Sequence, residues 1–345
     1  MKKIKVFLGG YINYINAQNI NCKAVAEHLD KEIFQVFSLT TYFGKQENFD
    51  VQTFYCFKPF RISKYIGFLW GILKCDVAYL PKHIDTPFWV LKLAKILKKP
   101  TFTTIEGNVI EKSLPNLIHL FGSERKMKKH FSFINKIFGI TNFLKVNTSE
   151  LLQMQDTILQ LGVDVDQFSV SRRSKLNSVV FVGSLIRRKQ LQEFIELGGS
   201  YPQLCFNLIG DGEEGEFLKN KSSKNIIFHG SLSHSSINEV FKISELMFLP
   251  SKSEGFPKVI LEAASAGIPS IVYNTYGASD WMKHYENGFV VNDIEEVKKV
   301  INNLIERPEI LKENSENAVN LAKKFDWKCV IKSWEKEIKD LYYGR

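Results

Sequence analysis

The sequence lacks a long hydrophobic run. No part of its 345 residues contains the ~18 uninterrupted apolar residues that a membrane-spanning helix requires. The opening MKKIKVFLGG is basic, but its apolar run is too short for a secretory signal. We therefore expect a first buried strand there, in a protein that neither spans a membrane nor is secreted.

Cysteine is also scarce. The five cysteines are scattered and form no Cys-x-x-Cys pair, so neither a disulfide framework nor a zinc site is expected. Low-complexity segments and short-period repeats are absent as well. These features are typical of a globular protein of the reducing cytosol.

The net charge of +9 is unevenly distributed. Residues 1–170 hold 22 Lys and Arg against 14 Asp and Glu, whereas residues 171–345 hold 24 against 23. A basic first half predicts an anionic partner, which could be a membrane surface, a nucleic acid or an acidic substrate. No nucleic-acid recognition motif is present, so we do not expect that partner.

Short apolar runs that alternate with helical patterns fill the second half. A chain of this length predicts two domains. The runs are apolar throughout, which is typical of parallel strands covered on both faces, and their spacing predicts a doubly wound α/β domain. The expected strands are residues 178–183, 204–210, 225–230, 245–250 and 269–273.

The first half repeats this theme less clearly. We expect strands at 3–10, 32–39, 53–57, 76–81 and 101–107, a helix at 88–97, a helix at 123–139 and a weak strand at 144–148. The resulting fold class is α/β, with two Rossmann-like doubly wound domains whose carboxyl strand ends face a central cleft. The expected domains are 1–168 and 169–325, with an amphipathic helix at 326–345 that packs back on the first.

The stretch SEGFPKVILEAASAGIP, residues 253–269, carries two carboxylates around a helix start. Glu254 lies in the loop after a strand, Pro257 suits a first helical turn, and Glu262 lies within the helix. A helix N-terminus binds anions such as phosphate, and carboxylates accept hydrogen bonds from hydroxyls. The pattern therefore fits a nucleotide sugar, although a capping acid and a surface glutamate would give the same spacing.

The stretch resembles the motif of the retaining glycosyltransferases of family 4, which have the GT-B fold. FVGSLIRRKQ (181–190), LIGDGEE (208–214) and FHGSLSHSSINEVF (228–241) match further motifs in the family order. The resemblance covers about residues 170–290 and is thin over residues 1–165.

The resemblance implies roles at the matching positions. Glu254 would contact the donor-sugar hydroxyls, Lys189 would neutralise the diphosphate, and Glu262 would bind the ribose. Ser184 stands where the family often has Arg, so Arg187 or Arg188 would supply the second cation. The implied donor-binding residues are Glu262, Arg188, Arg187, Gly255, Phe256, Lys258, Gly10, Gly183, Gly230 and Leu232.

The family needs no metal, because basic residues and a helix N-terminus replace the ion. Asp164-Val165-Asp166 matches the metal-binding triplet of the other glycosyltransferase fold. It lies in the segment between the domains, however, and no metal is expected there. No cofactor is expected beyond the substrate, a UDP- or GDP-sugar.

The first domain leaves several alternatives open. Gly9-Gly10 fits either a loop that approaches the ligand or a plain tight turn. Glu106 stands where family members often have His, and it is either a catalytic base for the acceptor hydroxyl or a capping acid. His83 is either a cleft residue or an ordinary loop residue.

The basic and aromatic stretch 123–139 fits either an interfacial helix or an amphipathic helix packed on its own sheet. Many enzymes that resemble this one act on lipid-linked acceptors at the membrane. Docking on an anionic membrane surface would explain the basic first half.

We therefore expect a retaining glycosyltransferase that moves a sugar from a nucleotide-diphosphate sugar to a glycan or lipid-linked acceptor. The setting would be the synthesis of cell-surface polysaccharide or glycolipid, in the cytoplasm and peripherally on the inner face of the cell membrane. The alternatives are another GT-B enzyme, such as a nucleotide-sugar epimerase, and a non-catalytic protein that binds membrane surfaces.

Overall fold

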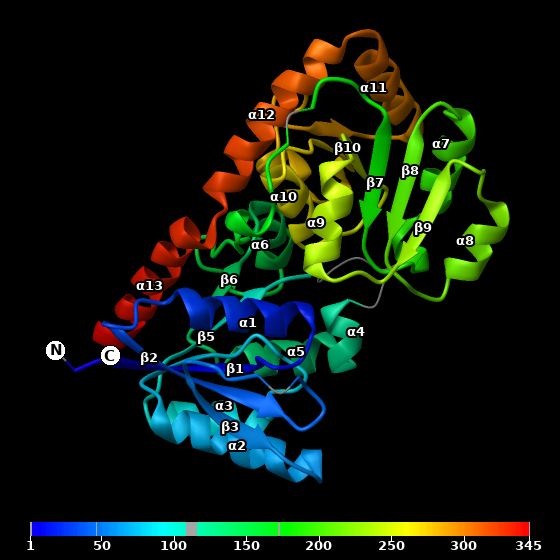
Figure 1. Ribbon diagram of the computed structural model, residues 1–345. Helices are drawn as coiled ribbons and strands as arrows, with labels where there is room; N and C mark the ends of the chain where they lie inside the picture. Colours follow the sequence, from blue (N-terminus) through cyan, green and yellow to red (C-terminus); the bar gives the residue numbers. More distant parts are fainter. Residues whose placement is uncertain (1, 46, 108–115, 172, 345) are drawn as a thin grey trace. The chain divides into compact units, whose positions relative to one another are not determined.

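The chain folds into two compact units (Figure 1). The computed structural model describes residues 2–45, 47–107, 116–171 and 173–344. Unit 1 comprises residues 1–161 and 330–345, and unit 2 comprises residues 162–329. The chain therefore passes from one unit to the other twice, and its last helix ends in unit 1.

Unit 1 is built on a six-stranded parallel sheet with the order β3-β2-β1-β4-β5-β6. Strands β1, β2, β4 and β5 are almost wholly buried, as is typical of parallel strands covered on both faces. The strands are β1 (Ile4–Tyr11), β2 (Phe34–Thr41), β3 (Gln52–Cys56), β4 (Val77–Tyr79), β5 (Thr101–Ile105) and β6 (Lys136–Gly139).

Helices connect these strands and cover the sheet. Asn16, Ser123 and Thr141 each cap a helix by accepting a backbone N–H bond in the first turn. The helices are α1 (Ala17–His28), α2 (Phe60–Lys74), α3 (Phe88–Ile96), α4 (Leu117–Phe121), α5 (Glu124–Phe131) and α6 (Asn142–Ser149), together with most of α13 (Trp327–Tyr343).

Two predictions for unit 1 were wrong. The expected helix 123–139 is the short helix α5 followed by strand β6, because Ile137 and Phe138 pair with β5 and are buried in the sheet. The expected strand 144–148 is part of helix α6, whose start Thr141 caps. The other five strands and the helix at 88–97 were placed correctly.

Unit 2 repeats the same topology with the order β12-β11-β10-β7-β8-β9, again all parallel. The five expected strands are present, and β12 is a sixth that was not expected. The strands are β7 (Ser178–Val182), β8 (Cys205–Ile209), β9 (Ile226–Gly230), β10 (Leu246–Leu249), β11 (Ser270–Tyr273) and β12 (Phe289–Val291).

The helices of unit 2 follow its strands in alternation. They are α7 (Gln192–Ser200), α8 (Gly215–Lys221), α9 (His234–Lys242), α10 (Lys258–Ser265), α11 (Ile294–Glu306) and α12 (Pro308–Lys324), with short 3-10 turns η1 (Val165–Gln167), η2 (Arg187–Lys189), η3 (Asn274–Tyr276) and η4 (Ala278–Asp280). Both units thus have the doubly wound α/β architecture that the sequence predicts.

The terminal helix α13 contributes to the core of unit 1. Trp334 is fully buried, packs edge-on against Tyr79, and donates its indole N–H to the carbonyl of Gln160 at 2.9 Å. Within the described residues, no helix is both long and apolar enough to cross a membrane.

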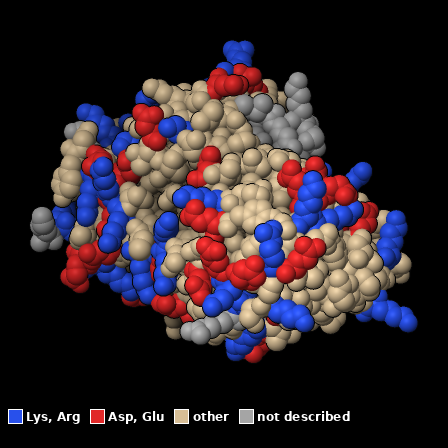
Figure 2. Space-filling view, turned by 90° about the horizontal axis from the view of Figure 1, so that it is seen from above, with Lys and Arg blue, Asp and Glu red and all other residues tan. Residues whose placement is uncertain are grey.

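Charge is divided unevenly between the units. Unit 1 holds 26 Lys and Arg against 15 Asp and Glu, and unit 2 holds 20 against 22. On the face shown in Figure 2, cationic and anionic side chains are interspersed rather than separated. The excess of basic residues in the chain therefore lies in unit 1.

Candidate active site

The predicted donor residues of unit 2 lie where its strand order reverses. Strands β7 and β10 are neighbours in the sheet, and the helices that follow them lead the chain in opposite directions. Open α/β sheets bind ligands at this switch point, beside the carboxyl ends of the strands. The segment after β7 carries Arg188 and Lys189, and the loop after β10 carries Glu254.

Lys189, Arg188 and Glu254 form one largely buried ionic cluster. The Lys189 ammonium donates to Glu254 Oε1 at 2.5 Å, and Arg188 Nη1 lies 3.3 Å from the same oxygen. Arg188 also donates to the carbonyl of Ser253. Only 12% of the Lys189 side chain and 9% of the Glu254 side chain are exposed. The cluster holds two cations against one carboxylate, so it carries a positive charge.

Burial and ion pairing act against each other in this cluster. Burial by itself would raise the pKa of the Glu254 carboxyl, but Lys189 and Arg188 outweigh it, and the pKa is lowered. Burial lowers the pKa of the Lys189 ammonium, and Glu254 opposes that change. Glu254 is therefore a carboxylate near neutral pH, held in place by the two cations.

The second cation of this cluster is Arg188 rather than Arg187. Arg187 is exposed in η2 and forms no ion pair with any other described residue. Arg188 points to the loop that carries Glu254 because η2 turns the chain by one short 3-10 turn. Of the two arginines that the sequence left open, Arg188 is the one that lies beside Glu254.

Glu262 lies on α10, inside unit 2. Burial raises the pKa of its carboxyl, nearby His234 and Lys258 lower it, and Asp164 raises it further. This carboxyl group has no hydrogen bond or ion pair with another described residue. Its oxygens are therefore available to accept hydrogen bonds from a ligand.

Helix α10 begins close to these carboxylates without a side-chain cap. Its N-cap residue is Pro257, one position earlier than the first-turn place expected from the sequence, and Pro257 provides no side-chain cap. Lys258 follows at the first position, over the ring of Trp327 at 5.9 Å. An uncapped helix start beside two cations offers several donors to an anion.

The remaining predicted donor residues differ in their surroundings. Gly183 closely approaches Gly210, because a Cβ on Gly210 would lie 1.8 Å from the Gly183 carbonyl oxygen. Gly230 has a left-handed φ of +67° and open space around it. Phe256 packs in an aromatic group with Trp281 and Phe325. Gly255 and Leu232 are only partly buried, in the loop before α10 and in the turn after β9.

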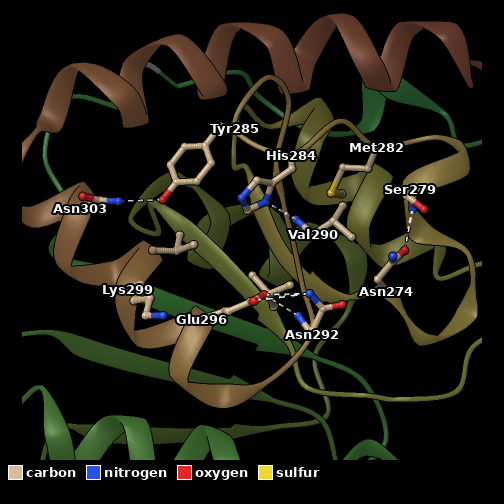
Figure 3. A pocket seen from close by; sticks show the side chains of 12 residues that line it. Asn274, Ser279, Met282, His284, Tyr285, Val290, Asn292, Glu296, Lys299 and Asn303 are labelled. Atoms are coloured by element: carbon tan, nitrogen blue, oxygen red, sulfur yellow. Dashed lines mark hydrogen bonds between the residues drawn. The ribbon is translucent and has the colours of Figure 1, made fainter.

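A separate hollow of about 560 Å³ lies at the far edge of unit 2 (Figure 3). It is lined by β12, α11 and the segments next to them, including Glu296, Asn292 and Lys299, and the Glu296 carboxylate accepts the Asn292 backbone N–H at 2.8 Å. None of the predicted donor residues lines it. The hollow is thus distinct from the switch-point cluster.

The Asp164-Val165-Asp166 triplet is divided between two environments. Asp164 lies near the Glu262 carboxyl, whereas exposed Asp166 forms an ion pair with Lys328 at 2.5 Å. The two carboxylates therefore serve different neighbours. Among the described residues there is no group of three or more His, Cys, Asp or Glu that could hold a metal ion.

In unit 1, Glu106 directly follows β5 and accepts hydrogen bonds from the side chains of Asn21, Thr104 and Tyr79. Asn21 Nδ2 donates to its Oε2 at 2.8 Å, while Thr104 Oγ1 and Tyr79 OH donate to its Oε1 at 3.0 and 3.2 Å. Glu106 therefore has a fixed position and caps no helix through these bonds. No pattern in the sequence indicates Asn21, Thr104 and Tyr79 as its partners, because they come from three separate elements.

The other unit 1 predictions have structural explanations. A Cβ on Gly10 would lie 2.6 Å from Cys22 Sγ, so its glycine is required where β1 packs on α1. His83 is buried against Phe131, and burial lowers its pKa to about 3. It is thus a core histidine rather than a cleft residue.

Comparison with known proteins agrees with this geometry. The sequence pattern of the family described as glycosyl transferases group 1 matches residues 162–321. An uncharacterized glycosyltransferase of Haemophilus influenzae is 24% identical over 277 residues, which cover 71% of this chain and 77% of that protein. The alpha-galactosylglucosyldiacylglycerol synthase of Streptococcus pneumoniae is 28% identical over 213 residues, which cover 58% of this chain and 54% of that protein.

Residues 162–321 of the chain thus carry the pattern of the group 1 glycosyl transferases. Among solved structures, Anabaena HepE in complex with UDP and glucose superposes with a TM-score of 0.77 at 15% identity, covering 98% of this chain and 100% of that chain. This likeness confirms the predicted GT-B fold. The matched family region contains Arg188, Lys189, Glu254 and Glu262.

Proposed function

We propose that this glycosyltransferase binds a nucleotide-diphosphate sugar in unit 2. The observation that carries the proposal is the buried cluster of Lys189, Arg188 and Glu254 beside the uncapped start of α10. Lys189 and Arg188 would neutralise the diphosphate, whose charge grows as it departs. Glu254 would then accept hydrogen bonds from the sugar, and Glu262 from the ribose.

Several of the remaining donor residues would line this site. Backbone N–H groups of Gly255 and Phe256 would meet the sugar and diphosphate, near Lys258. The nucleobase side would be formed by Gly230 and Leu232, and the diphosphate side by Gly183 and Arg187. Support for a uridine nucleotide comes from HepE, which was solved with UDP and with UDP-glucose.

We propose a retaining reaction in which the protein itself supplies the charge compensation. The bond between the anomeric carbon and the diphosphate oxygen breaks, and a bond to the acceptor oxygen forms on the same face. The acceptor hydroxyl proton passes to a phosphate oxygen. The residues of unit 2 then act by orienting the sugar and stabilising the departing charge.

The acceptor would be a glycan or a lipid-linked sugar of cell-surface polysaccharide or glycolipid synthesis. Relatives with such names include the diacylglycerol glycolipid synthase above and an Escherichia coli galactosyltransferase for a GlcNAc-diphosphoundecaprenol. Glu106 would face the acceptor hydroxyl, because it is a fixed carboxylate at the carboxyl edge of the unit 1 sheet.

A membrane-docking face on α2 and α3 would bring the enzyme to such an acceptor. One stripe of α2 consists of Ile62, Tyr65, Ile66, Leu69 and Leu73, each between 36% and 57% exposed, while the opposite stripe packs on the sheet. Positions 62, 65, 66, 69 and 73 share one side of a helix. The stretch 123–139 does not provide this face, because its apolar residues are buried in unit 1.

Aromatic and cationic residues surround this docking face. Trp89 of α3 is exposed and lies 6.4 Å from Tyr65, ring centre to ring centre. Residues 58–99 contain nine Lys and Arg against two Asp. Aromatic and basic residues beside an apolar stripe suit an anionic bilayer, and the shared positive charge disfavours pairing with a second copy.

Nucleotide binding can be tested by thermal shift with UDP, GDP, ADP, CMP and their sugars. A ligand at 100 times its Kd stabilises the native state by about 2.7 kcal/mol. We expect one diphosphate to raise the melting temperature of the wild type, Glu262→Ala to lose that rise, and exposed Glu216→Ala to keep it. The donor-site proposal fails if no nucleotide shifts the melt.

Membrane docking has a separate test with vesicles of phosphatidylcholine, with and without phosphatidylglycerol. The wild type should co-sediment with the anionic vesicles, and Ile66→Glu/Leu69→Glu should remain in the supernatant. Ile243→Glu, which changes an exposed isoleucine of unit 2, is the matched control. Equal sedimentation of all three proteins would refute docking through α2.

A further inference from the structure

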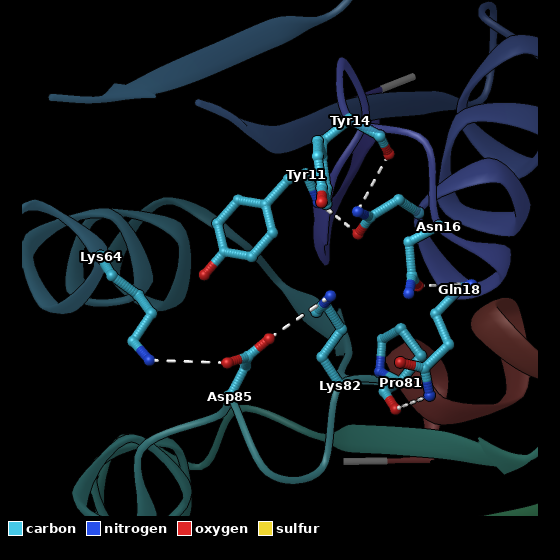
Figure 4. Close-up of polar contacts among 9 residues, drawn as sticks. Tyr11, Tyr14, Asn16, Gln18, Lys64, Pro81, Lys82 and Asp85 are labelled. Carbon is cyan, nitrogen blue, oxygen red and sulfur yellow. Dashed lines mark hydrogen bonds and ion pairs between the residues drawn. The ribbon is translucent and has the colours of Figure 1, made fainter. Parts of the chain in front are cut away.

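A second charged cluster lies at the switch point of unit 1 (Figure 4). Strands β1 and β4 are neighbours where the strand order reverses. Tyr11 ends β1, Lys82 and Asp85 follow β4, and Lys64 reaches the cluster from α2. Four residues from three separate segments thus converge at the edge of the sheet where open α/β folds bind ligands.

Two lysines of this cluster share one carboxylate. Lys82 Nζ lies 3.3 Å from one oxygen of Asp85, and Lys64 Nζ lies 3.6 Å from the other. Only 10% of the Lys82 side chain and 17% of the Lys64 side chain are exposed, against 41% for Asp85. Neither ammonium has another ion-pair partner in the described part of the chain.

This arrangement leaves positive charge and donor capacity unsatisfied. Each ammonium carries three N–H donors, and buried cations are normally surrounded by acceptors. The remaining neighbours of these two are aromatic faces: Lys82 Nζ lies 5.3 Å from the Tyr11 ring centre and Lys64 Nζ 5.8 Å from that of Tyr65. The two ammonium groups therefore have N–H donors available to bind an anion.

The Tyr11 hydroxyl points independently to a ligand. Tyr11 is 3% exposed, and its hydroxyl has no hydrogen-bond partner among the described residues. In Figure 4 this hydroxyl is directed toward the side of the cluster where Lys64 and Asp85 meet. A buried hydroxyl without a partner is uncommon in native proteins and calls for an explanation.

We propose that Lys64, Lys82 and Tyr11 bind a phosphate group of the acceptor. The proposal rests on the proposed sugar transfer and adds the chemical class of the acceptor, which would be a phosphate ester. Asp85 now bridges the lysines through two oxygens, and two phosphate oxygens would bridge them in the same way. The third phosphate oxygen accepts the Tyr11 O–H, as Asp85, the most exposed member, turns outward.

The position of Lys64 favours a phosphate that belongs to a lipid. Lys64 lies on the same helix as Tyr65 and Ile66 of the proposed docking face. The Lys64 ammonium lies 5.8 Å from the ring centre of Tyr65, which belongs to the apolar stripe, so a phosphate held by Lys64 has a residue of the stripe close by. A free phosphate ion would use the same donors but would not contact that stripe.

Tyr11→Phe separates a binding role from a structural one. The change removes only the hydroxyl, which bonds nothing in the described protein, so the melting temperature should stay the same or rise. Binding of octyl phosphate, measured by calorimetry below its micelle concentration, should weaken about tenfold, the effect of one lost charge-assisted hydrogen bond. Lys82→Gln should weaken it at least as much.

Controls distinguish this site from the donor site and from free phosphate. Lys74→Gln, an exposed lysine of α2, and Glu262→Gln of unit 2 should keep the wild-type affinity for octyl phosphate. Inorganic phosphate should bind more weakly than octyl phosphate, and equal affinity would overturn the lipid source. Unchanged octyl phosphate binding in both Tyr11→Phe and Lys82→Gln would overturn the site, whereas a nucleotide shift that persists in Tyr11→Phe would leave the donor proposal intact.

Discussion

Removing Lys189 should destabilise unit 2 strongly, because Glu254 would keep a buried charge with a weaker partner. In the native protein only 9% of the Glu254 side chain is exposed, and Lys189 is its nearest cation at 2.5 Å. Breaking a buried ion pair from one side costs about 3–5 kcal/mol. Arg188 remains 3.3 Å away, so we expect the lower end, about 3 kcal/mol, for Lys189→Met.

The assay is urea unfolding of the full chain, monitored with a probe that reports on unit 2. In thermal unfolding, the melting temperature of Lys189→Met should be lower by about 6–12 °C, since 1 kcal/mol of free energy shifts the melting temperature of a domain of this size by about 2–4 °C. The double variant Lys189→Met/Glu254→Gln should recover most of the loss, because no unpaired charge remains. Lys219→Met, which removes an exposed ion pair with Glu216, should cost under about 0.5 kcal/mol.

The pH dependence provides an independent check of the same pair. The folded pKa of Glu254 is lowered from its ordinary value of 4.5, so its contribution to stability is present above that value and is lost as the pH falls through the lowered pKa. Lys189→Met should reduce this acid sensitivity. Our account is refuted if Lys189→Met unfolds at the same urea concentration as Lys219→Met.

Three further predictions concern unit 1. His83 and His130 have folded pKa values lowered to about 3 and about 4, so the chain takes up protons when it unfolds below pH 6.5. As the pH falls below 6.5, the free energy of unfolding should therefore decrease by up to about 1.4 kcal/mol per pH unit for each histidine, and His83→Gln should flatten the pH profile of the melting temperature. Trp334→Ala should cost about 3–5 kcal/mol in chemical unfolding, because this fully buried ring anchors α13, and a loss below 1 kcal/mol would show that α13 is not part of the unit 1 core. Glu106→Gln should lower the rate of sugar transfer at least tenfold while nucleotide thermal shifts stay unchanged, and a loss of the shifts would contradict a role confined to the acceptor.

Much of the fold was predictable, for a local physical reason. Strands covered on both faces are mostly apolar, so runs such as SVVFVG and ELMFLP can be recognised as strands from the sequence alone. The error at 123–139 has the opposite cause. Helix α5 and strand β6 follow closely within one basic and aromatic stretch, and only pairing with β5 decides that Ile137 and Phe138 form a strand rather than continue a helix.

The residues of the proposed donor site could be named from the sequence, but most of their contacts with one another could not. Glu254, Glu262 and Lys189 stand in contiguous motifs, whose order along the chain carries information. Which arginine accompanies Lys189 depends on one 3-10 turn, and sequence spacing could not distinguish Arg187 from Arg188. Direct contacts between motifs 65 residues apart depend on the sheet, which makes β7 and β10 neighbours.

By itself, the sequence determined the α/β class, most strands, the basic excess of the first half and the motif residues of unit 2. These properties follow from composition, periodicity and local chemistry. Only the tertiary structure decided that His83 is buried, that Glu106 bonds to Asn21 and Tyr79, and that Tyr11, Lys64, Lys82 and Asp85 meet. Such groupings arise because a parallel sheet brings the carboxyl ends of distant strands to one edge, which no local pattern records.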